Sequence, residues 1–284
     1  MIRKIIIPVR GDGKSGNVFA HAAILAHRFK AHIVVTHCRP RPEDLLPYGV
    51  PVPAFMREMF VEQSSKVADL EEQSLQEEMT TLARQYGIEM MEKPTGNTAS
   101  FSWFEEAGRQ VDIIKRHGRL ADLICVAKPD RDRNLGANTL KAALFNTGRP
   151  VMMCPPADNP QENLGNHIAI AWNGSQEASR AIALTLDLFQ KAEHVTVLTT
   201  GKHPHGASSE ELIEYLAMRE VKASINRFEA SSNIAARLLE ESKSIGADMM
   251  VMGAYGHSHE RETIFGGNTQ SVVDTAKMPV VMVH

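Results

Sequence analysis

Residues 247–253 read ADMMVMG, and an earlier stretch of the same chain, residues 121–127, reads ADLICVA. Both stretches begin with Ala-Asp and continue as an apolar run that no polar residue interrupts. Unbroken apolar runs of this length are typical of parallel strands that are covered by helices on both faces. The two stretches therefore predict a central strand of an α/β sheet that occurs twice in one chain.

Three further pairs of segments recur in the same order, which indicates a longer internal repeat. They are IIIPVRG at 5–11 with IAIAWNG at 168–174, Asn138-Thr139 with Asn268-Thr269, and PVMM at 150–153 with PVVM at 279–282. Between the copies, residues 155–166 are rich in Pro, Asp, Asn and Gly, which is typical of a linker. We predict two domains, residues 1–155 and 166–284.

In both copies, short apolar runs alternate with longer helical patterns, which is typical of βαβ units. The expected strands lie near residues 3–9, 32–38, 88–92, 121–127 and 150–154, and near 167–172, 194–200, 221–227, 247–252 and 279–283. The expected helices lie near residues 17–30, 54–86, 100–117 and 137–147, and near 176–190, 208–218, 232–245 and 267–277. Right-handed crossovers then give two doubly wound parallel sheets, packed as an intramolecular pseudo-dimer. Ligands bind such sheets beyond the carboxyl ends of the strands, so four loops are candidates: 10–16, 127–137, 173–176 and 253–267.

The composition excludes several classes of protein. The net charge of −3 and the aromatic content of 6% do not fit a nucleic-acid binder. No apolar stretch approaches the roughly 18 residues that a membrane-spanning helix needs. The three cysteines form no C-x-x-C pair, and no secretory signal is recognisable. We expect a cytoplasmic protein without nucleic-acid or membrane partners.

The loop after the strand at 247–252 carries the strongest functional signal. Gly253-x-x-Gly256 is followed by nine residues and then by Gly266, Gly267, Asn268 and Thr269, where a helix is expected to begin. Glycines allow backbone N–H groups to approach an anion closely, and a helix N-terminus adds unsatisfied donors and a favourable dipole. The spacing predicts a phosphate-binding loop.

This spacing resembles that of the universal stress protein family, and the resemblance covers nearly the whole chain as a tandem pair. Asn173-Gly174-Ser175 looks like the Asp-Gly-Ser turn of the family, and residues 278–283 look like its last strand. The resemblance implies five-stranded domains of the adenine nucleotide alpha hydrolase type and a stress-response protein that binds ATP, with Mg²⁺, in its second domain. The nucleotide-binding residues it implies are Asn173, Gly253, Gly256, Gly266, Gly267, Asn268 and Thr269.

The chain also departs from the family pattern. ATP-binding members usually carry Asp where Asn173 stands and Ser or Thr where Gly267 stands, so Asn268 or Thr269 would have to replace that hydroxyl. In the first copy, Ala127-Lys128-Pro129-Asp130 stands where the glycine turn is expected. Pro129 has no N–H to donate, and Asp130 brings negative charge to the place of a phosphate. We expect the first site to have lost its nucleotide.

Three other interpretations stay open. Residues 11–16, GDGKSG, spell the dinucleotide fingerprint G-x-G-x-x-G, and Arg39 and Arg41 would suit an NADP-dependent enzyme, although the second copy has no matching pattern. Alternatively, both sites are degenerate and the long helix at 54–86 binds a protein partner. A homodimer of the whole chain also stays open. The histidines at 203, 205, 257 and 259 could bind zinc, but exposed loop histidines are the preferred interpretation. No catalytic residue is recognisable, so we expect at most slow ATP hydrolysis.

Overall fold

The computed structural model describes residues 1–39, 41, 53–156, 162–201, 206–229, 232–256 and 267–284. Its first half contains strands β1 (Lys4–Val9), β2 (His32–Arg39), β3 (Glu89–Met90), β4 (Ser100–Ala107), β5 (Leu123–Ala127) and β6 (Val151–Cys154). The helices of this half are α1 (Ser15–Phe29), α2 (Ala54–Gln85), α3 (Gln110–Gly118) and α4 (Ala137–Asn146).

The second half repeats the alternation of strand and helix. Its strands are β7 (His167–Ala171), β8 (His194–Thr199), β9 (Ala223–Arg227), β10 (Met249–Gly253) and β11 (Val280–Val283). Its helices are α5 (Gln176–Leu184), α6 (Leu186–Lys191), α7 (Ser209–Ala217), α8 (Ile234–Ser244) and α9 (Asn268–Thr275). Among the described residues, no helix is both long and apolar enough to cross a membrane.

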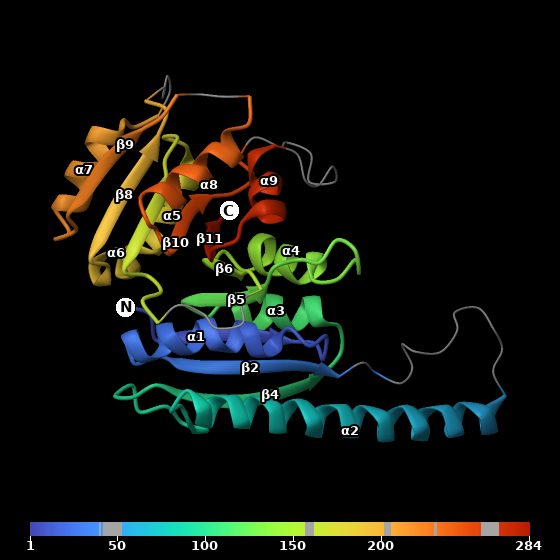
Figure 1. Ribbon diagram of the computed structural model, residues 1–284. Helices are drawn as coiled ribbons and strands as arrows, with labels where there is room; N and C mark the ends of the chain where they lie inside the picture. Colours follow the sequence, from blue (N-terminus) through green and yellow to red (C-terminus); the bar gives the residue numbers. More distant parts are fainter. Residues whose placement is uncertain (40, 42–52, 157–161, 202–205, 230–231, 257–266) are drawn as a thin grey trace.

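All of these strands form one sheet in the order β3-β4-β2-β1-β5-β6-β11-β10-β7-β8-β9 (Figure 1). The strands within each half are parallel, and the halves meet where β6 pairs antiparallel with β11, with Met152 opposite Val281. The last strands of the two halves thus pair with each other, as expected of two copies related by a local two-fold axis. Helices cover both faces of the sheet, so β5, β6, β10 and β11 are almost wholly buried. The α/β fold predicted from the sequence is confirmed.

The predicted helix at residues 100–117 is wrong in its first half. Residues Ser100–Ala107 form β4, which pairs along its whole length with β2, and the helix begins only at Gln110. The segment begins SFSW, in which aromatic residues alternate with serines, and three aromatic residues in its first five positions fit a strand. The strand predicted at 88–92 is only the two-residue β3 at the sheet edge. The helix predicted at 176–190 is divided at Thr185, whose hydroxyl donates to the Ala181 carbonyl oxygen at 2.7 Å.

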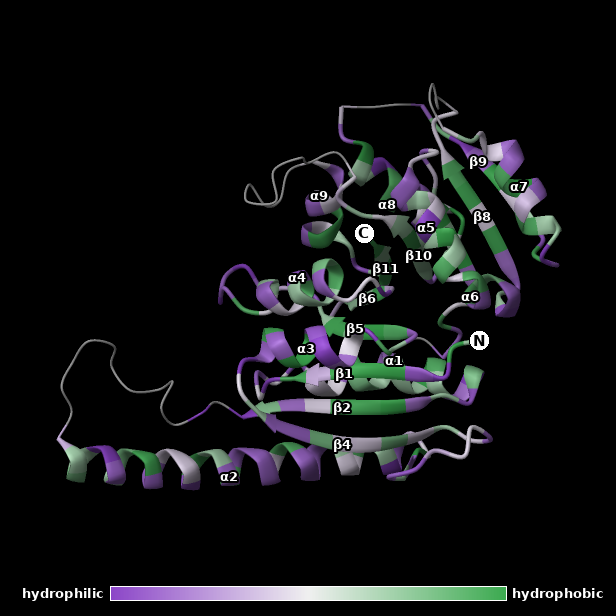
Figure 2. Cartoon of the chain, turned by 180° about the vertical axis from the view of Figure 1, so that it is seen from behind, coloured by the Kyte–Doolittle hydropathy of each residue, from purple (hydrophilic) through white to green (hydrophobic). Residues whose placement is uncertain are grey.

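Helix α2 buries its apolar side chains against the rest of the molecule in its C-terminal half, and Ser65 and Asp69 before it contact Arg39 of β2. Leu75, Met79 and Ala83 are buried, whereas every residue from 53 to 60 is exposed. The N-terminal half of the helix extends beyond the sheet into solvent (Figure 2). Between these halves, Glu72 of α2 shares a hydrogen bond with Glu105 of β4, and burial together with this carboxylate neighbour raises the pKa of Glu105 to about 7.

Glu105 should make the stability of the protein fall as the pH rises. Its pKa in the folded chain, about 7, lies above the ordinary value of 4.5, so the folded chain keeps a proton that the unfolded chain loses. The resulting stabilisation is complete below about pH 4.5 and is lost as the pH rises through 7. Between pH 5.5 and 8 we expect the wild type to lose roughly 1–3 kcal/mol relative to Glu105→Gln. Urea unfolding at both pH values measures this.

The control is Glu77→Gln, a change at an exposed position of α2, whose unfolding free energy should depend on pH as that of the wild type does. If the unfolding free energy of Glu105→Gln also showed the wild-type pH dependence, the assignment to Glu105 would be contradicted.

Candidate nucleotide site

A cavity of about 600 Å³ lies at the carboxyl ends of β7 and β10. This is the point in the second half where the strand order switches, since β7 lies between β10 and β8. Doubly wound sheets bind ligands at such points because the loops after the two strands diverge there. The volume lies within the range of roughly 300–1,000 Å³ that is typical of small-molecule sites.

The cavity has an apolar part and a polar part. The apolar part is formed by side chains of the sheet and of α8 with its preceding loop: Ala171, Leu198, Phe228, Ile234, Leu238 and Met252. The polar part is formed by the ends of β7, β8 and β10 and the start of α9: Asn173, Ser175, Glu177, Thr199, Thr200, Gly253, Gly256, Gly267, Asn268 and Thr269. A ligand that fills this space would therefore place an apolar group at one end and polar groups at the other.

The structure brings the predicted site residues together. Asn173, Gly253, Gly256, Gly267, Asn268 and Thr269 all line the cavity, although they come from two loops about 80 residues apart. Gly266 lies outside the described residues. The two loops that the repeat and the glycine spacing singled out therefore border this cavity.

The loop after β7 is held in place by its own hydrogen bonds. The Asn173 Oδ1 accepts from the Ser175 N–H at 3.1 Å, and the Ser175 Oγ caps α5 by accepting from the Ala178 N–H at 3.2 Å. The Trp172 Nε1–H donates to the Ala207 carbonyl oxygen at 3.0 Å and so ties this loop to the start of α7. Because the oxygen of Asn173 is already used, its NH₂ group is the part that can donate to a ligand.

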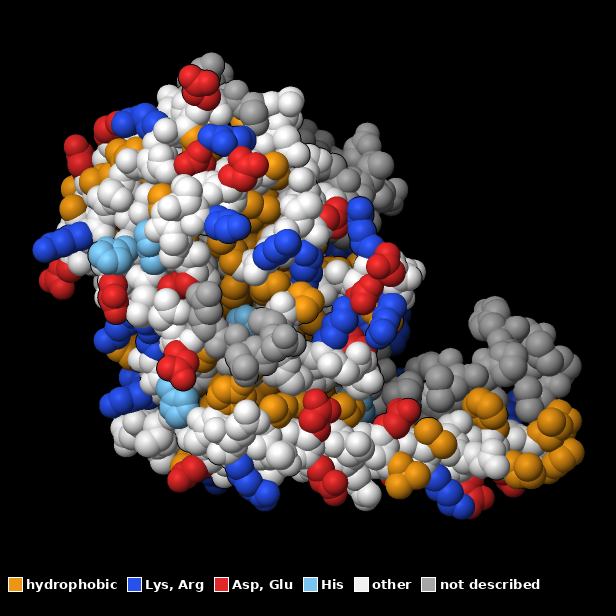
Figure 3. All heavy atoms as spheres, viewed as in Figure 1, with side chains coloured by type: hydrophobic (Ala, Val, Ile, Leu, Met, Phe, Trp, Pro, Cys, Tyr) orange, Lys and Arg blue, Asp and Glu red, His pale blue; other side chains and the backbone are white. Residues whose placement is uncertain are grey.

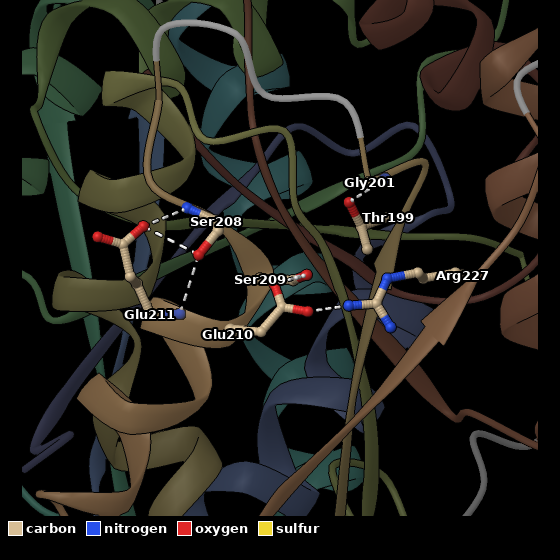
Figure 4. Close-up of polar contacts among 7 residues, drawn as sticks. All are labelled: Thr199, Gly201, Ser208, Ser209, Glu210, Glu211 and Arg227. Carbon is tan, nitrogen blue, oxygen red and sulfur yellow. Dashed lines mark hydrogen bonds and ion pairs between the residues drawn. The ribbon is translucent and has the colours of Figure 1, made fainter.

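Next to Thr199, which lines the cavity, polar groups after β8, at the start of α7 and on β9 bind one another (Figure 4). The Thr199 Oγ1 accepts from the Gly201 N–H at 3.1 Å. Ser208 and Glu211 form a capping box at the start of α7, in which the Ser208 Oγ accepts from the Glu211 N–H at 3.2 Å. Arg227 of β9 forms an ion pair with Glu210. The charge of Arg227 is thus neutralised by a neighbouring carboxylate.

The two glycines of the turn after β10 pack against α5. A Cβ atom on Gly253 would collide with the backbone of Glu177 and Ala178, and one on Gly256 would collide with the Glu177 carboxylate. Glu177 therefore lies against the glycine turn, inside the cavity wall. Packing alone requires glycine at position 253, where the obstacle is backbone, whereas at position 256 the Glu177 carboxylate could turn away from a new side chain.

The start of α9 is open by comparison. Gly267, with a φ of +81°, precedes the helix, and a Cβ atom there would meet nothing within 4 Å. Among the described residues, no side chain caps the first turn of α9, which leaves its backbone N–H groups for an acceptor in the cavity. The Thr269 Oγ1 accepts from the Tyr255 N–H at 3.3 Å, which leaves the hydroxyl hydrogen of Thr269 to donate to a ligand.

Tyr255 connects the cavity to the first half of the chain. Its backbone has a φ of +59°, and its ring packs at 5.2 Å from the ring of Phe145 on α4. The Phe145 ring also contacts His284 at 4.8 Å, so the end of the chain joins the same cluster. Burial raises the pKa of the Tyr255 hydroxyl, which stays protonated. The position of Tyr255 between two loop glycines was the only signal of this role in the sequence.

Comparison with known proteins identifies the second half. Residues 166–284 match the model of the universal stress protein family. Residues 166–284 are therefore a domain of the universal stress protein family. The match covers both loops that line the cavity, and a comparison with curated proteins found no match.

Solved structures resemble both halves at once. A universal stress protein from Archaeoglobus fulgidus is 15% identical, with a TM-score of 0.71, and the alignment covers 99% of this chain and 95% of that one. A functionally unknown protein from Pseudomonas aeruginosa is 16% identical, with a TM-score of 0.52 and coverage of 99% and 92%. At such low identity the likeness shows a shared fold alone. That fold extends over the whole tandem of this universal stress protein.

The corresponding place in the first half is filled by side chains of the protein. Lys14 Nζ forms an ion pair with Asp130 Oδ2 at 3.1 Å, and Arg10 donates from a guanidinium nitrogen to the Thr139 Oγ1 at 3.1 Å. The backbone N–H of Arg133 and then Lys14 lower the pKa of Asp130, which stays charged. The remaining cavity is about 20 Å³, room for roughly one water molecule.

This closed site bears on two interpretations of the sequence. The negative charge of Asp130, which we expected to repel a phosphate, is instead neutralised by Lys14 from the loop at residues 11–16. The same cavity leaves no space for a dinucleotide beside that loop, so the NADP interpretation gains no support. Arg39 is likewise engaged, by Asp69 at 2.5 Å and Glu72 at 3.8 Å.

The histidine clusters lie outside the part of the chain that the structure describes. This holds for His203 and His205, and for His257 and His259. Within the described ranges, no group of three or more His, Cys, Asp or Glu side chains is arranged to hold a metal ion. The cysteines at 38, 125 and 154 are free thiols, and two of them are buried in the sheet.

Proposed function

We propose that this universal stress protein binds an adenine nucleotide, ATP with Mg²⁺, in the cavity of its second half. The observation that carries the proposal is the division of one cavity into an apolar part and a part formed by glycines and a helix N-terminus. A nucleotide has the same two parts, a planar base and an anionic phosphate chain. Asn173, between the two parts, would reach the ribose or the base.

The phosphate end suits an anion for two reasons. The uncapped start of α9 supplies N–H donors and the positive end of the helix dipole, and Gly267 places no side chain in the way. Gly253, Gly256 and Gly266 would add backbone N–H groups, and Asn268 and Thr269 would add side-chain donors. Thr269 in this arrangement takes the place of the hydroxyl that the family usually carries at position 267.

The charge of the cavity argues for a metal ion together with the phosphates. Among the described residues that line it, Glu177 is the only charged one, and its carboxylate lies against Gly256. Without a cation, this carboxylate would repel a nearby phosphate by several tenths to a few kcal/mol. When bound, Mg²⁺ supplies the positive charge that the described wall lacks, and Glu177 and the phosphates are the oxygen ligands that it prefers.

We propose that residues 166–284 are the nucleotide-binding domain and that residues 1–155 are a related domain whose site has closed. Among the described residues that line the cavity, no side chain is placed as a general base with a perturbed pKa, and the role we infer is binding or sensing of nucleotide, with hydrolysis at most slow. Such a protein would act in the cytoplasm in a stress response.

Asn268→Asp is expected to weaken ATP binding by roughly 100-fold. The new carboxylate would lie at the phosphate end, where repulsion at about 4 Å amounts to a few kcal/mol. Acidic residues are favourable in the first turn of a helix, so the fold should be unaffected. Calorimetric titration of the nucleotide-stripped protein with ATP and Mg²⁺ measures the change, and the wild type should bind about one nucleotide per chain.

Ser271→Asp is the matched control for that experiment. It adds the same charge to the same helix, but Ser271 does not line the cavity. We expect it to bind ATP within about threefold of the wild type, as remote, solvent-screened charges contribute little. Equal weakening by both variants would contradict the site, and no binding by the wild type would contradict the function.

The alternative function is that of an interaction protein with two closed sites. The observation that favours it is the exposed apolar surface of α2, on which Phe55, Met59 and Leu70 are more than half exposed. Failure of the wild type to bind nucleotide, or to retain it through purification, would favour this alternative.

A further inference from the structure

Helix α2 carries two apolar stripes on different sides. The first, formed by Leu75, Met79 and Ala83, is buried against the sheet. The second, which we call the distal stripe, lies on the projecting N-terminal half and consists of Met56, Met59, Phe60, Gln63, Val67 and Leu70. At about 100° per residue, these six positions fall within roughly 100° of the helix surface, more than a third of a turn away from the buried stripe. The distal stripe therefore points away from the sheet on which α2 packs.

The distal stripe is exposed to solvent. The exposed fractions are 49% for Met56, 59% for Met59, 38% for Phe60, 55% for Val67 and 68% for Leu70. Hydrophobic side chains gather on the projecting end of α2 in the space-filling view (Figure 3). Isolated exposed apolar residues are common, but a continuous apolar stripe with helical spacing is typical of a surface that binds another helix.

The amount of apolar surface fits a pair of such helices. With the neighbouring Phe55, the stripe exposes six large apolar side chains, each about half exposed, or roughly 600 Å². Two copies together would bury about 1,200 Å², the lower limit of a standard specific interface. On one edge of the stripe, Lys66 and Glu62 form an ion pair at 2.8 Å, as expected of a polar rim.

We propose that the distal stripe binds the distal stripe of a second copy of this chain, with the two α2 helices antiparallel. The stripe is self-complementary about Gln63. In this register, Met56 faces Leu70 of the second copy, Met59 faces Val67, and Gln63 faces itself. Two facing amides satisfy each other, because each carries both a donor and an acceptor. The contact is then the same on both chains, as a two-fold dimer requires.

The projection of α2 leaves room for this pairing. The register overlaps residues 53–73 of the two chains and ends before Leu75, the first buried residue of the helix. At about 1.5 Å per residue, the overlap is roughly 30 Å long, and it lies on the side of α2 opposite to Ser65, Asp69 and Glu72, which contact Arg39 and Glu105 of the sheet. This dimer is separate from the β6–β11 contact, which already joins the two halves within one chain. It does not depend on nucleotide binding.

The competing occupant is the segment of residues 42–52 of the same chain, which is rich in Pro and Leu and lies outside the described residues. Sedimentation of the whole protein over a range of concentrations distinguishes the two. We expect a species of about twice 31.4 kDa that dissociates on dilution. A mass of one chain at all concentrations up to about 100 µM would overturn the proposal, because an interface of this size is expected to hold at that concentration.

Met59→Glu should weaken the dimer at least about 100-fold, since each dimer would then bury two uncompensated carboxylates. Position 59 is exposed in the single chain, so the circular dichroism and the unfolding temperature should not change. Thr81→Glu is the matched control. It adds the same charge to an exposed position on the same side of α2, beyond the overlap, and should leave the dimer intact. Loss of the dimer in both variants, or in neither, would overturn the proposal.

A charge pair tests the register. Met56→Glu and Leu70→Lys should each give single chains, and an equimolar mixture should form a one-to-one dimer, because position 56 of one chain faces position 70 of the other. A parallel pair would place position 56 against position 56, and the mixture of the two variants would then form no dimer. A dimer in the mixture supports the antiparallel arrangement, and single chains in the mixture overturn it.

Discussion

Replacing Asp248 by alanine is expected to lower the free energy of unfolding by about 3–5 kcal/mol. The Asp248 carboxylate is 7% exposed and accepts from the backbone N–H groups of Gly165 at 2.5 Å, Asn166 at 3.0 Å and His167 at 2.8 Å. It thereby fixes the residues that lead into β7 against the start of β10. Alanine would leave the N–H groups of Gly165 and His167 without these charged acceptors, and each such loss costs roughly 1.5–3 kcal/mol.

The first half of the chain provides a matched control for this prediction. Asp122 stands at the repeat position of Asp248 and accepts from the N–H groups of Arg3 at 2.8 Å and Lys4 at 2.9 Å, at the start of β1. It has one donor fewer and is only half-buried, so Asp122→Ala should cost about 1–3 kcal/mol. Urea unfolding of both variants measures the difference. Equal losses would show that the number and burial of the N–H donors do not set the cost.

These two aspartates show why the repeat could be recognised from the sequence. The Ala-Asp pair before the apolar run occurs in both copies. In each copy its carboxylate accepts from backbone N–H groups at the start of a neighbouring strand. The apolar runs at 121–127 and 247–253 were predicted as central strands, and both lie in the middle of the sheet. Signals of this kind are local, since burial on both faces removes polar residues from the run itself.

Elements at the edge of the sheet were harder to predict. Residues 100–107 pair with β2 on one side and only with the short β3 on the other, and near the end of this edge strand Glu105 points toward α2 and Glu106 toward α3. A segment with half-exposed acidic residues next to a true helix is easily taken as the start of that helix. The tertiary contact with β2 decides the outcome, and no local pattern contains it.

The candidate site was predictable only in part. The repeat and the glycine spacing located the loops, because both are features of consecutive residues. The apolar end of the cavity was not foreseen, since Leu198, Phe228 and Leu238 come from three separate elements that only the fold brings together. The same is true of Glu177, which reaches the glycine turn from the first turn of α5, and of Lys14, which neutralises Asp130 across the first half.

Gly253→Ala is expected to destabilise the protein by about 2–4 kcal/mol even when no ligand is present. The new Cβ atom would lie too close to the backbone of Glu177 and Ala178, and backbone atoms cannot turn away as the end of a flexible side chain can. Helix α5 would have to shift, which is the usual cost of overpacking with a further contribution from lost contacts. Because the loops before α5 and after β10 both line the cavity, ATP binding should weaken in the same variant.

The first half again supplies the comparison. Ala127 stands at the repeat position of Gly253, at the end of β5, so the end of the equivalent strand carries a Cβ atom in the first half. Gly267→Ala is the second comparison, because its Cβ atom would meet none of the described atoms within 4 Å, so its cost of about 1–3 kcal/mol would come from the backbone strain at a φ of +81° and a ψ of −156°. Urea unfolding without nucleotide, followed by ATP titration, measures both effects. If Gly253→Ala had the unfolding free energy of the wild type and only its ATP binding were weaker, this glycine would be needed for the ligand alone. The close contact with α5 predicts instead that the variant loses stability before any ligand is added.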